Sequence, residues 1–203
     1  MHWWPGETPF EVMVGAVLTQ QVSWSNVEKA IENLSRHGGL SVAGILSLPH
    51  EELGLLIRPT RYYNQKARRL KDVCGAVRED AADDVELFLG QDPAALRRRL
   101  LGIRGIGEET ADSILLYAAG RPVFVIDNYT HRILQRLGKA RGHESYDDLQ
   151  ALFEFNLPRE VLLYNEYHAL LVALGHHVCL KSRPRCPHCP LAAVCGYCLQ
   201  SDR

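Results

Sequence analysis

The segment 101–134, LGIRGIGEETADSILLYAAGRPVFVIDNYTHRIL, decides the fold. It begins with a glycine-rich turn at 102–107 and predicts a helix over 108–119. A short apolar run, 122–126, then leads to Asp127 at the start of a second helix. Glycine tolerates positive φ and the close approach of another backbone. Because the first amides of a helix have no partner within that helix, the turn predicts a seat for a phosphate, followed by one carboxylate.

This segment has two interpretations, and it leaves both open when taken alone. The pattern Gly-x-x-Gly-x-Gly is a weak signal, since no predicted strand precedes it as a dinucleotide site requires. In the simpler interpretation the glycines only form a loop, and Asp127 only caps a helix, with Thr130 three residues further on. In the functional interpretation the turn holds a DNA backbone beside an acid.

Composition limits the class of protein. The 203 residues suffice for one large or two small domains, and 46% apolar residues support a packed core. With a net charge of -1, affinity for DNA has to come from local patches and helix ends. There is no apolar run of about 18 residues, which a membrane span requires. The N-terminus shows no signal peptide, so we expect a cytoplasmic protein, nucleoid-associated if it is bacterial.

Apolar residues recur with helical spacing along most of the chain. We expect helices over 9–21, 24–36, 63–78, 108–119 and 159–177, and no segment alternates convincingly as a strand. Thr8, Pro9 and Glu11 form a capping box with proline in the first turn of the first of these helices. The sequence therefore predicts an all-α fold.

The most basic part of the chain surrounds the helix break at Pro59. Its cations alternate with two tyrosines, which fits a loop that contacts a DNA strand through phosphates and stacked bases. The alternative is a solvated helix face. The basic residues are Arg58, Arg61, Lys66, Arg68, Arg69 and Lys71. A second run, Arg97 to Arg99, precedes the glycine turn and has the same two interpretations.

Four cysteines near the C-terminus have the spacing C-x6-C-x2-C-x5-C. They are Cys179, Cys186, Cys189 and Cys195. Four thiols in a proline-rich stretch predict a metal-bound loop in a reducing compartment. Zinc accepts four thiolates, and so does a [4Fe–4S] cluster, so the spacing alone does not choose between them. Cys198 is an extra thiol, and Cys74 is expected in the core.

The motifs LxGIxGIG, TAxxIL and VIDNYTHRIL resemble the helix-hairpin-helix superfamily of DNA glycosylases, in particular the endonuclease III group. The resemblance implies that the motif at about 96–119 grips the DNA backbone and that Asp127 serves catalysis. It also implies an amide at Gln21 that fills the space left by a flipped base, and a second wedge residue at Tyr62. The hairpin residues implied to bind DNA are Ile103, Arg104, Gly105 and Gly107.

The same resemblance implies a cofactor and a domain arrangement. The cysteine spacing is similar to the iron–sulfur loop of endonuclease III-like enzymes, which implies a structural [4Fe–4S] cluster at 179–195. A monovalent cation at the hairpin is a further expectation. The implied architecture is a helical domain at 1–121 with the hairpin and another at 122–203 with the cluster, and a DNA-binding groove between them. We expect a monomer that acts on damaged double-stranded DNA.

One residue departs from the bifunctional enzymes of this family. Those enzymes carry a lysine nucleophile in the pattern GxGxKTA, whereas the matching stretch 105–111 has Glu109 in that place. A carboxylate cannot form a Schiff base with the sugar, so this covalent route is closed. Water is then the nucleophile, and Asp127 stabilises positive charge developing on the sugar.

A second resemblance concerns the base. The stretches WWP, FEVxxGAVLTQ, YYNQKARRL and GIGEETADSILLYA are similar to the 3-methyladenine DNA glycosylase III group. This implies a base pocket built from Trp3, Trp4 and Trp24, and Glu109 adds a nearby negative charge. Cationic N-alkylated purines gain from electron-rich ring faces. A lysine of that group is missing, since the chain has His176 and His177 near its place; these histidines either reach the pocket or are structural.

These observations predict a monofunctional DNA glycosylase that flips out alkylated purines and hydrolyses their N-glycosidic bond, without AP lyase activity. Two alternatives remain open. One is an endonuclease III-type glycosylase and AP lyase for oxidised pyrimidines. The other is a non-catalytic protein that binds lesions.

Overall fold

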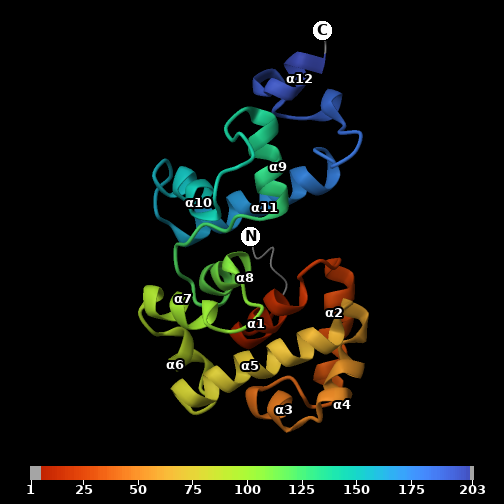
Figure 1. Ribbon diagram of the computed structural model, residues 1–203, viewed down its shortest axis with the longest axis vertical. Coiled ribbons are helices and arrows are strands. Elements are labelled where there is room, and N and C mark those ends of the chain that lie inside the picture. The colour runs from red at the N-terminus through yellow and green to blue at the C-terminus, as the bar shows by residue number, and fades with distance from the viewer. Residues whose placement is uncertain (1–5, 202–203) are drawn as a thin grey trace. The chain divides into compact units, whose positions relative to one another are not determined.

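The computed structural model describes residues 6–201, and within them every regular element is helical (Figure 1). The all-α prediction is confirmed. Trp3 and Trp4 lie outside the described residues. The chain divides between Arg121 and Pro122 into two compact units. Within 6–201, no helix combines the length and the apolar character that crossing a bilayer requires.

The unit that ends at Arg121 carries the glycine-rich turn. Its elements are α1 (Pro9–Leu18), α2 (Trp24–Arg36), α3 (Val42–Ser47), α4 (His50–Leu56), the 3-10 turn η1 (Arg58–Thr60), α5 (Tyr63–Ala81), α6 (Val85–Leu89), α7 (Pro93–Leu101), α8 (Glu108–Ser113) and the π turn η2 (Ile114–Ala118). The predicted helix at 108–119 is therefore α8 followed by one π turn, in which Ala119 donates to Ile114 O.

Helix α1 lies at the centre of this unit and is buried almost all round. The Thr8 side chain caps it by accepting from Glu11 N at 3.2 Å, as the capping box predicts. Every residue from Val12 to Leu18 is buried. The helix packs against α2, α5, α6, α8 and the π turn, so it supports both the basic segment and the hairpin.

Two cations of the basic segment serve the core instead of solvent. Lys66 is 1% exposed, and its Nζ donates to Leu18 O at 2.8 Å and to Thr60 O at 2.5 Å. Burial, with Arg69 nearby, lowers the pKa of Lys66 to about 8. Lys71 Nζ donates to the carbonyls that end α3. The expectation that these two lysines face DNA phosphates is therefore wrong, because both satisfy helix-terminal carbonyls.

The unit that begins at Pro122 carries the acid and the cysteines. Its elements are α9 (Asn128–Leu137), α10 (Tyr146–Glu154), α11 (Val161–His177), the 3-10 turns η3 (Cys186–His188) and η4 (Ala192–Val194), and α12 (Gly196–Ser201). Helices α9 and α11 pack against each other, and α12 contacts α9.

The apolar run before Asp127 is extended, and side chains of α10 replace the partners that a sheet would provide. Phe124 N donates to Glu154 Oε1 at 3.0 Å, and Phe124 O accepts from Gln150 Nε2 at 2.7 Å. Ile126 N donates to the Tyr146 hydroxyl at 3.2 Å. Since buried backbone groups need partners, these contacts fix the path of the chain into Asp127.

Candidate active site and cysteine loop

The hairpin between α7 and α8 exposes its glycines and buries its isoleucines. Gly105 has a φ of +87°, a conformation that favours glycine, and a Cβ on it would also push aside the end of the Arg69 side chain. Arg104, Gly105 and Gly107 are exposed. These three residues form the part of the hairpin that a phosphate can reach.

Ile103 has a different place from its neighbours. Its side chain is 7% exposed, and Ile106 is 4% exposed. Its N–H donates to Leu100 O, and its carbonyl accepts from Ile106 N, both at 3.0 Å. Ile103 therefore packs the hairpin against the core, and its backbone groups are already used within the turn.

The hairpin is held from behind by Gln20, which the sequence analysis overlooked. Gln20 Nε2 donates to Gly105 O at 3.2 Å and to Thr110 Oγ1 at 2.9 Å. Arg69 donates to Gln20 Oε1. This chain of contacts ties the end of α1 and the middle of α5 to the turn. It also occupies the Gly105 carbonyl, which leaves the expected monovalent cation without support.

A buried ion pair joins the two helices of the hairpin. Arg97 Nε donates to Asp112 Oδ1 at 2.7 Å and Arg97 Nη2 to Oδ2 at 3.1 Å, and Asp112 is fully buried. Arg99 pairs with Glu79 and Asp80 of α5. Of the run Arg97 to Arg99, only Arg98 is exposed. The phosphate-contact interpretation is therefore wrong for Arg97 and Arg99.

The two predicted wedge residues share an unusual backbone. Gln21 has a φ of 58° and Tyr62 a φ of 46°, both in the left-handed region. Both side chains are exposed, Tyr62 by 61%. Non-glycine residues in this region cost of order 1–3 kcal/mol and cluster at functional sites. Trp24 is half-buried in the first turn of α2, and Glu109 is exposed in the first turn of α8.

Asp127 does cap a helix, but only with one oxygen. Its Oδ1 accepts from Thr130 N at 2.7 Å, which begins α9. Its Oδ2 lies 3.9 Å from His168 Nε2, and the two side chains are 12% and 4% exposed. Burial lowers the pKa of His168 below its ordinary value, and the Asp127 carboxylate opposes that shift. The shift favours the neutral imidazole.

The sequence analysis weighed other histidines and missed His168. His176 is exposed, and its Nδ1 lies 3.4 Å from the Tyr129 hydroxyl. His177 is exposed and packs edge-on against His176. The available signal was helical periodicity. The buried face of α11 consists of Tyr164, His168, Leu171 and Gly175. A histidine at one of these regularly spaced positions could have been predicted to be buried.

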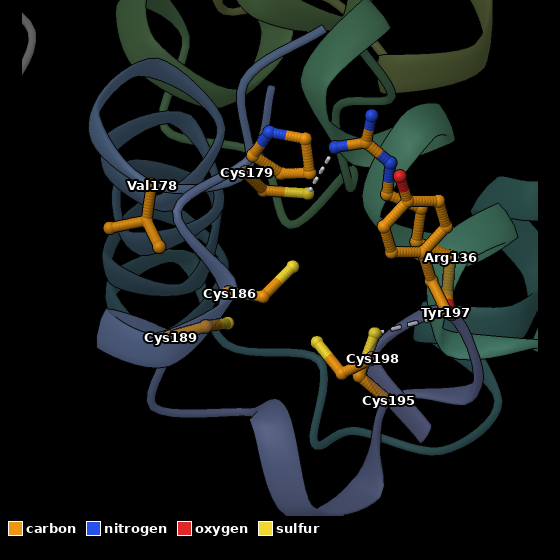
Figure 2. Close-up of a pocket in the computed structure, with 9 residues that line it drawn as sticks. Arg136, Val178, Cys179, Cys186, Cys189, Cys195, Tyr197 and Cys198 are labelled. Carbon is orange, nitrogen blue, oxygen red and sulfur yellow. Dashed lines mark hydrogen bonds between the residues drawn. The ribbon is translucent and has the colours of Figure 1, made fainter. Parts of the chain in front are cut away.

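The four predicted ligands line one pocket beside α9 (Figure 2). Arg136 Nη1 donates to Cys179 Sγ at 3.1 Å, and Cys195 Sγ donates to Arg136 O at 3.3 Å. Cys198, which we predicted to be an extra thiol without a role, lines the same pocket and is buried. Cys74 is buried in the other unit, as expected.

The same helix connects the acid to the cysteine loop. Arg132 donates to Cys179 O and to Gly175 O, both at 2.9 Å. Arg136 adds bonds to Leu180 O at 2.7 Å and to Lys181 O at 3.0 Å. Helix α9 therefore begins at Asp127 and is bonded to the loop along its second half.

The family profile described as "HhH-GPD superfamily base excision DNA repair protein" matches residues 14–159. The chain belongs to this superfamily. The resemblance to helix-hairpin-helix glycosylases is confirmed. The match spans the hairpin, Asp127 and the end of α10, so the hairpin and Asp127 both lie within the part of the chain that matches the family.

Relatives of two kinds resemble this HhH-GPD protein. A Methanocaldococcus jannaschii protein is 45% identical, over 96% of this chain and 88% of its own length. Its name, a DNA repair glycosylase, is itself provisional. Endonuclease III of Bacillus subtilis is 27% identical, over 92% of this chain and 80% of its own.

Solved structures show the same two kinds. A 3-methyladenine DNA glycosylase from H. pylori bound to 1,N6-ethenoadenine has a TM-score of 0.74 at 33% identity, covering 85% of this chain and 86% of that one. An endonuclease III–DNA complex has a TM-score of 0.85 at 25% identity, covering 98% and 88%.

The cysteine loop of this HhH-GPD protein provides the donor set of a four-cysteine metal site. The four thiols line a common pocket. Both a [4Fe–4S] cluster and a zinc ion accept four thiolates, so the residues present fit either group.

Proposed function

We propose that this HhH-GPD protein is a monofunctional DNA glycosylase that hydrolyses the N-glycosidic bond of alkylated purines such as 3-methyladenine. The observation that carries the proposal is Glu109. It is exposed in the first turn of α8, at the position where lyases of the family carry their amine. A carboxylate there forms no Schiff base, so the sugar is attacked by water.

The acid of the reaction is Asp127. Its Oδ1 is fixed by the cap of α9, and the side chain is 12% exposed, so the carboxylate stays within reach of a bound sugar. A fixed carboxylate stabilises the oxocarbenium-like charge that develops as the base leaves. An alkylated purine already carries positive charge and leaves readily, so a carboxylate without a strong general acid suits this substrate class.

DNA is held and opened by exposed groups of the first unit. Arg104, Gly105 and Gly107 present the hairpin to the backbone, and Arg69 and Gln20 keep it rigid. Gln21 and Tyr62 stand out on left-handed turns and fill the stack when the base is extruded. The indole of Trp24, with Trp3 and Trp4 from the N-terminus, offers ring faces to a cationic base, worth roughly 0.5–2 kcal/mol.

Cys179, Cys186, Cys189 and Cys195 hold the [4Fe–4S] cluster in this proposal. The cluster supplies a cross-link of the loop from 179 to 195. Arg136 donates to Cys179 Sγ and to two loop carbonyls, so the protein contributes a fixed cation to the same pocket. Iron and acid-labile sulfide in equal amounts in the purified protein would support this assignment.

The test is a base-release panel on methylated, oxidised and deaminated duplex DNA. The wild-type protein should release 3-methyladenine, leave the strand intact and form no borohydride-trapped adduct. The matched variant Glu109→Lys restores an amine and should become trappable, while Asp127→Asn should release almost nothing.

Endonuclease III chemistry is the second candidate, since the endonuclease III–DNA complex has the higher TM-score of the two structures compared, 0.85 against 0.74. Release of oxidised pyrimidines with strand nicking and a trapped wild-type adduct would establish it and overturn our proposal. Tight binding of abasic DNA with no release of any base would instead identify a lesion-binding protein.

A further inference from the structure

The cysteine pocket contains one thiol more than a four-cysteine cofactor needs. Cys198 is 7% exposed and lines the pocket together with the four assigned cysteines (Figure 2). Figure 2 shows its side chain beside that of Cys195, in the same pocket as Cys186. A buried thiol among cofactor ligands is therefore within reach of the same group.

Local structure places Cys198 beside one particular ligand. Helix α12 begins at Gly196, directly after Cys195, and Leu199 N donates to Cys195 O at 3.1 Å. This bond closes one helical turn, so residues three apart such as Cys195 and Cys198 lie on the same face. Cys195 Sγ donates a hydrogen bond to Arg136 O, whereas Cys198 lines the same pocket as Cys186.

We propose that Cys198 is an alternative ligand that takes over the iron position of Cys195. The proposal rests on the cluster assigned above. The exchange moves no electrons: the Cys198 thiol loses its proton and binds iron as a thiolate, and the released Cys195 thiolate takes up a proton. A loop with this reserve ligand keeps its cofactor when Cys195 is alkylated or oxidised.

The test compares iron and sulfide content per full-length chain, with the visible absorption spectrum, in a set of matched variants. Cys195→Ala and Cys198→Ala should each keep nearly all of the wild-type iron, and the double variant should lose it. Cys186→Ala is the control for a ligand without a substitute and should also lose it. Alanine is chosen because a serine oxygen is itself able to bind iron.

Two outcomes overturn the proposal. If Cys195→Ala loses iron as completely as the double variant while its helical circular dichroism stays native, Cys198 does not substitute. If the wild-type protein, purified without oxygen, contains no iron, the cofactor assignment itself fails. Base release by the wild-type protein is measured in parallel and reports on the glycosylase proposal separately.

A second inference starts from the buried histidine next to the acid. His168 is 4% exposed on α11, and its Nε2 points to the Asp127 oxygen that the helix cap leaves unused. The 3.9 Å between the two atoms is longer than a direct hydrogen bond, so a small side-chain shift or one water closes it. A neutral imidazole offers one N–H to such a carboxylate.

We infer that His168 is the positioning residue of Asp127, and this inference rests on the catalytic role proposed for that acid. Thr130 N holds Oδ1 at the helix end, and His168 holds Oδ2 from the buried side. With both oxygens held, the carboxylate plane stays fixed when charge develops on the sugar. Misplacing a catalytic group by about 1 Å costs up to about a hundredfold in rate.

Three variants test this role. His168→Leu keeps the volume but removes the N–H, and should lower the single-turnover rate of base release by about tenfold to a hundredfold with unchanged affinity for abasic DNA. His168→Gln and His168→Asn supply an amide N–H at two different reaches, and at least one should recover most of the rate. In the Asp127→Asn background His168→Leu should have no further effect, since coupled residues are not additive.

A wild-type rate for His168→Leu would overturn this role, and so would an equal loss in the Asp127→Asn background. Equal failure of all three variants with a lowered melting temperature would assign His168 to packing alone. Absence of base release by the wild-type protein is a different result, which refutes the proposed function.

Discussion

The hairpin and the cysteine loop are held together in opposite ways. The hairpin is fixed by the protein alone, through the buried Arg97–Asp112 pair and the chain from Arg69 through Gln20 to Gly105. The loop at 179–195 has two 3-10 turns of three residues each, and most of its side chains are exposed or half-buried. Stability in the hairpin comes from side-chain pairs, whereas under the proposed function the cysteine loop also depends on a bound group.

The largest effect should follow from removing that group. Cys186→Ala, or chelation of iron from the reduced protein, should strongly reduce the protection of residues 179–201 against limited proteolysis, because the bonds from α9 reach only Cys179, Leu180, Lys181 and Cys195. Mass spectrometry of the fragments identifies the cleavage sites. The hairpin should keep its protection in the same digest, and early cleavage there would contradict the difference between the two regions.

The second largest effect should follow from changing Asp127. Its role as the cap of α9 and its proposed role in catalysis can be measured separately. Asp127→Asn keeps a good helix cap, so stability should hardly change while single-turnover base release falls by about 10²–10⁴-fold. Asp127→Ala should lose a similar factor in rate and in addition about 1 kcal/mol of stability. Chemical denaturation and rate measurements on both variants distinguish the cap from the catalyst. An active Asp127→Asn protein would refute the catalytic assignment.

The next largest effect should be on stability. The Arg97–Asp112 pair inside the hairpin should contribute more to it than the surface pairs of Arg99. Asp112→Ala removes the buried carboxylate that Arg97 bonds, and because Arg97 is itself 26% exposed, the loss should be about 1.5–3 kcal/mol of unfolding free energy. Arg99→Ala is the matched control, because its partners Glu79 and Asp80 lie at the surface and such pairs contribute about 0–1 kcal/mol. Urea denaturation gives the unfolding free energy of both variants. Equal losses would show that the Arg97–Asp112 pair stabilises the unit no more than a surface pair does.

The smallest effects should separate the two adjacent glutamines. Gln20→Leu removes the bonds to Gly105 and Thr110 and should cost about 1–3 kcal/mol and weaken DNA binding. Gln21→Gly relieves a left-handed backbone and should raise stability by up to about 1 kcal/mol, while base release falls. Thermal unfolding measures the stability of both variants, DNA titration measures their affinity, and the release assay measures their activity. The same response in both variants would mean that the residues are interchangeable.

The sequence was sufficient for the parts of the fold that depend on local pattern. The glycine turn, the cap at Asp127 and the apolar stripes predicted the all-α fold and the hairpin. It could not show which of Gln20 and Gln21 faces inward, because that depends on a contact with Gly105, 85 residues away. The positive charge of a residue also does not show which way its side chain points. We predicted that Lys66 faces DNA, but it is buried and bonded to the end of α1.

His168 was missed for a related reason. Its helix is apolar on most sides, so a histidine on it has no distinctive pattern, and only the packing of α11 on α9 shows that Asp127 is its neighbour. Cys198 was set aside because it lies outside the four-cysteine spacing. Its place in the pocket depends on where α12 begins.

The geometry of α9 has a mechanical consequence. The helix has ten residues, so it is about 15 Å long. Its first residue follows Asp127, and Arg136 in its last turn donates to Cys179 and to the carbonyls of Leu180 and Lys181. A helix anchored in this way transmits a displacement from one end to the other, so a shift of the cysteine loop also moves Asp127. Under the proposed function, we therefore expect oxidation of the loop thiols to lower base release before the chain unfolds.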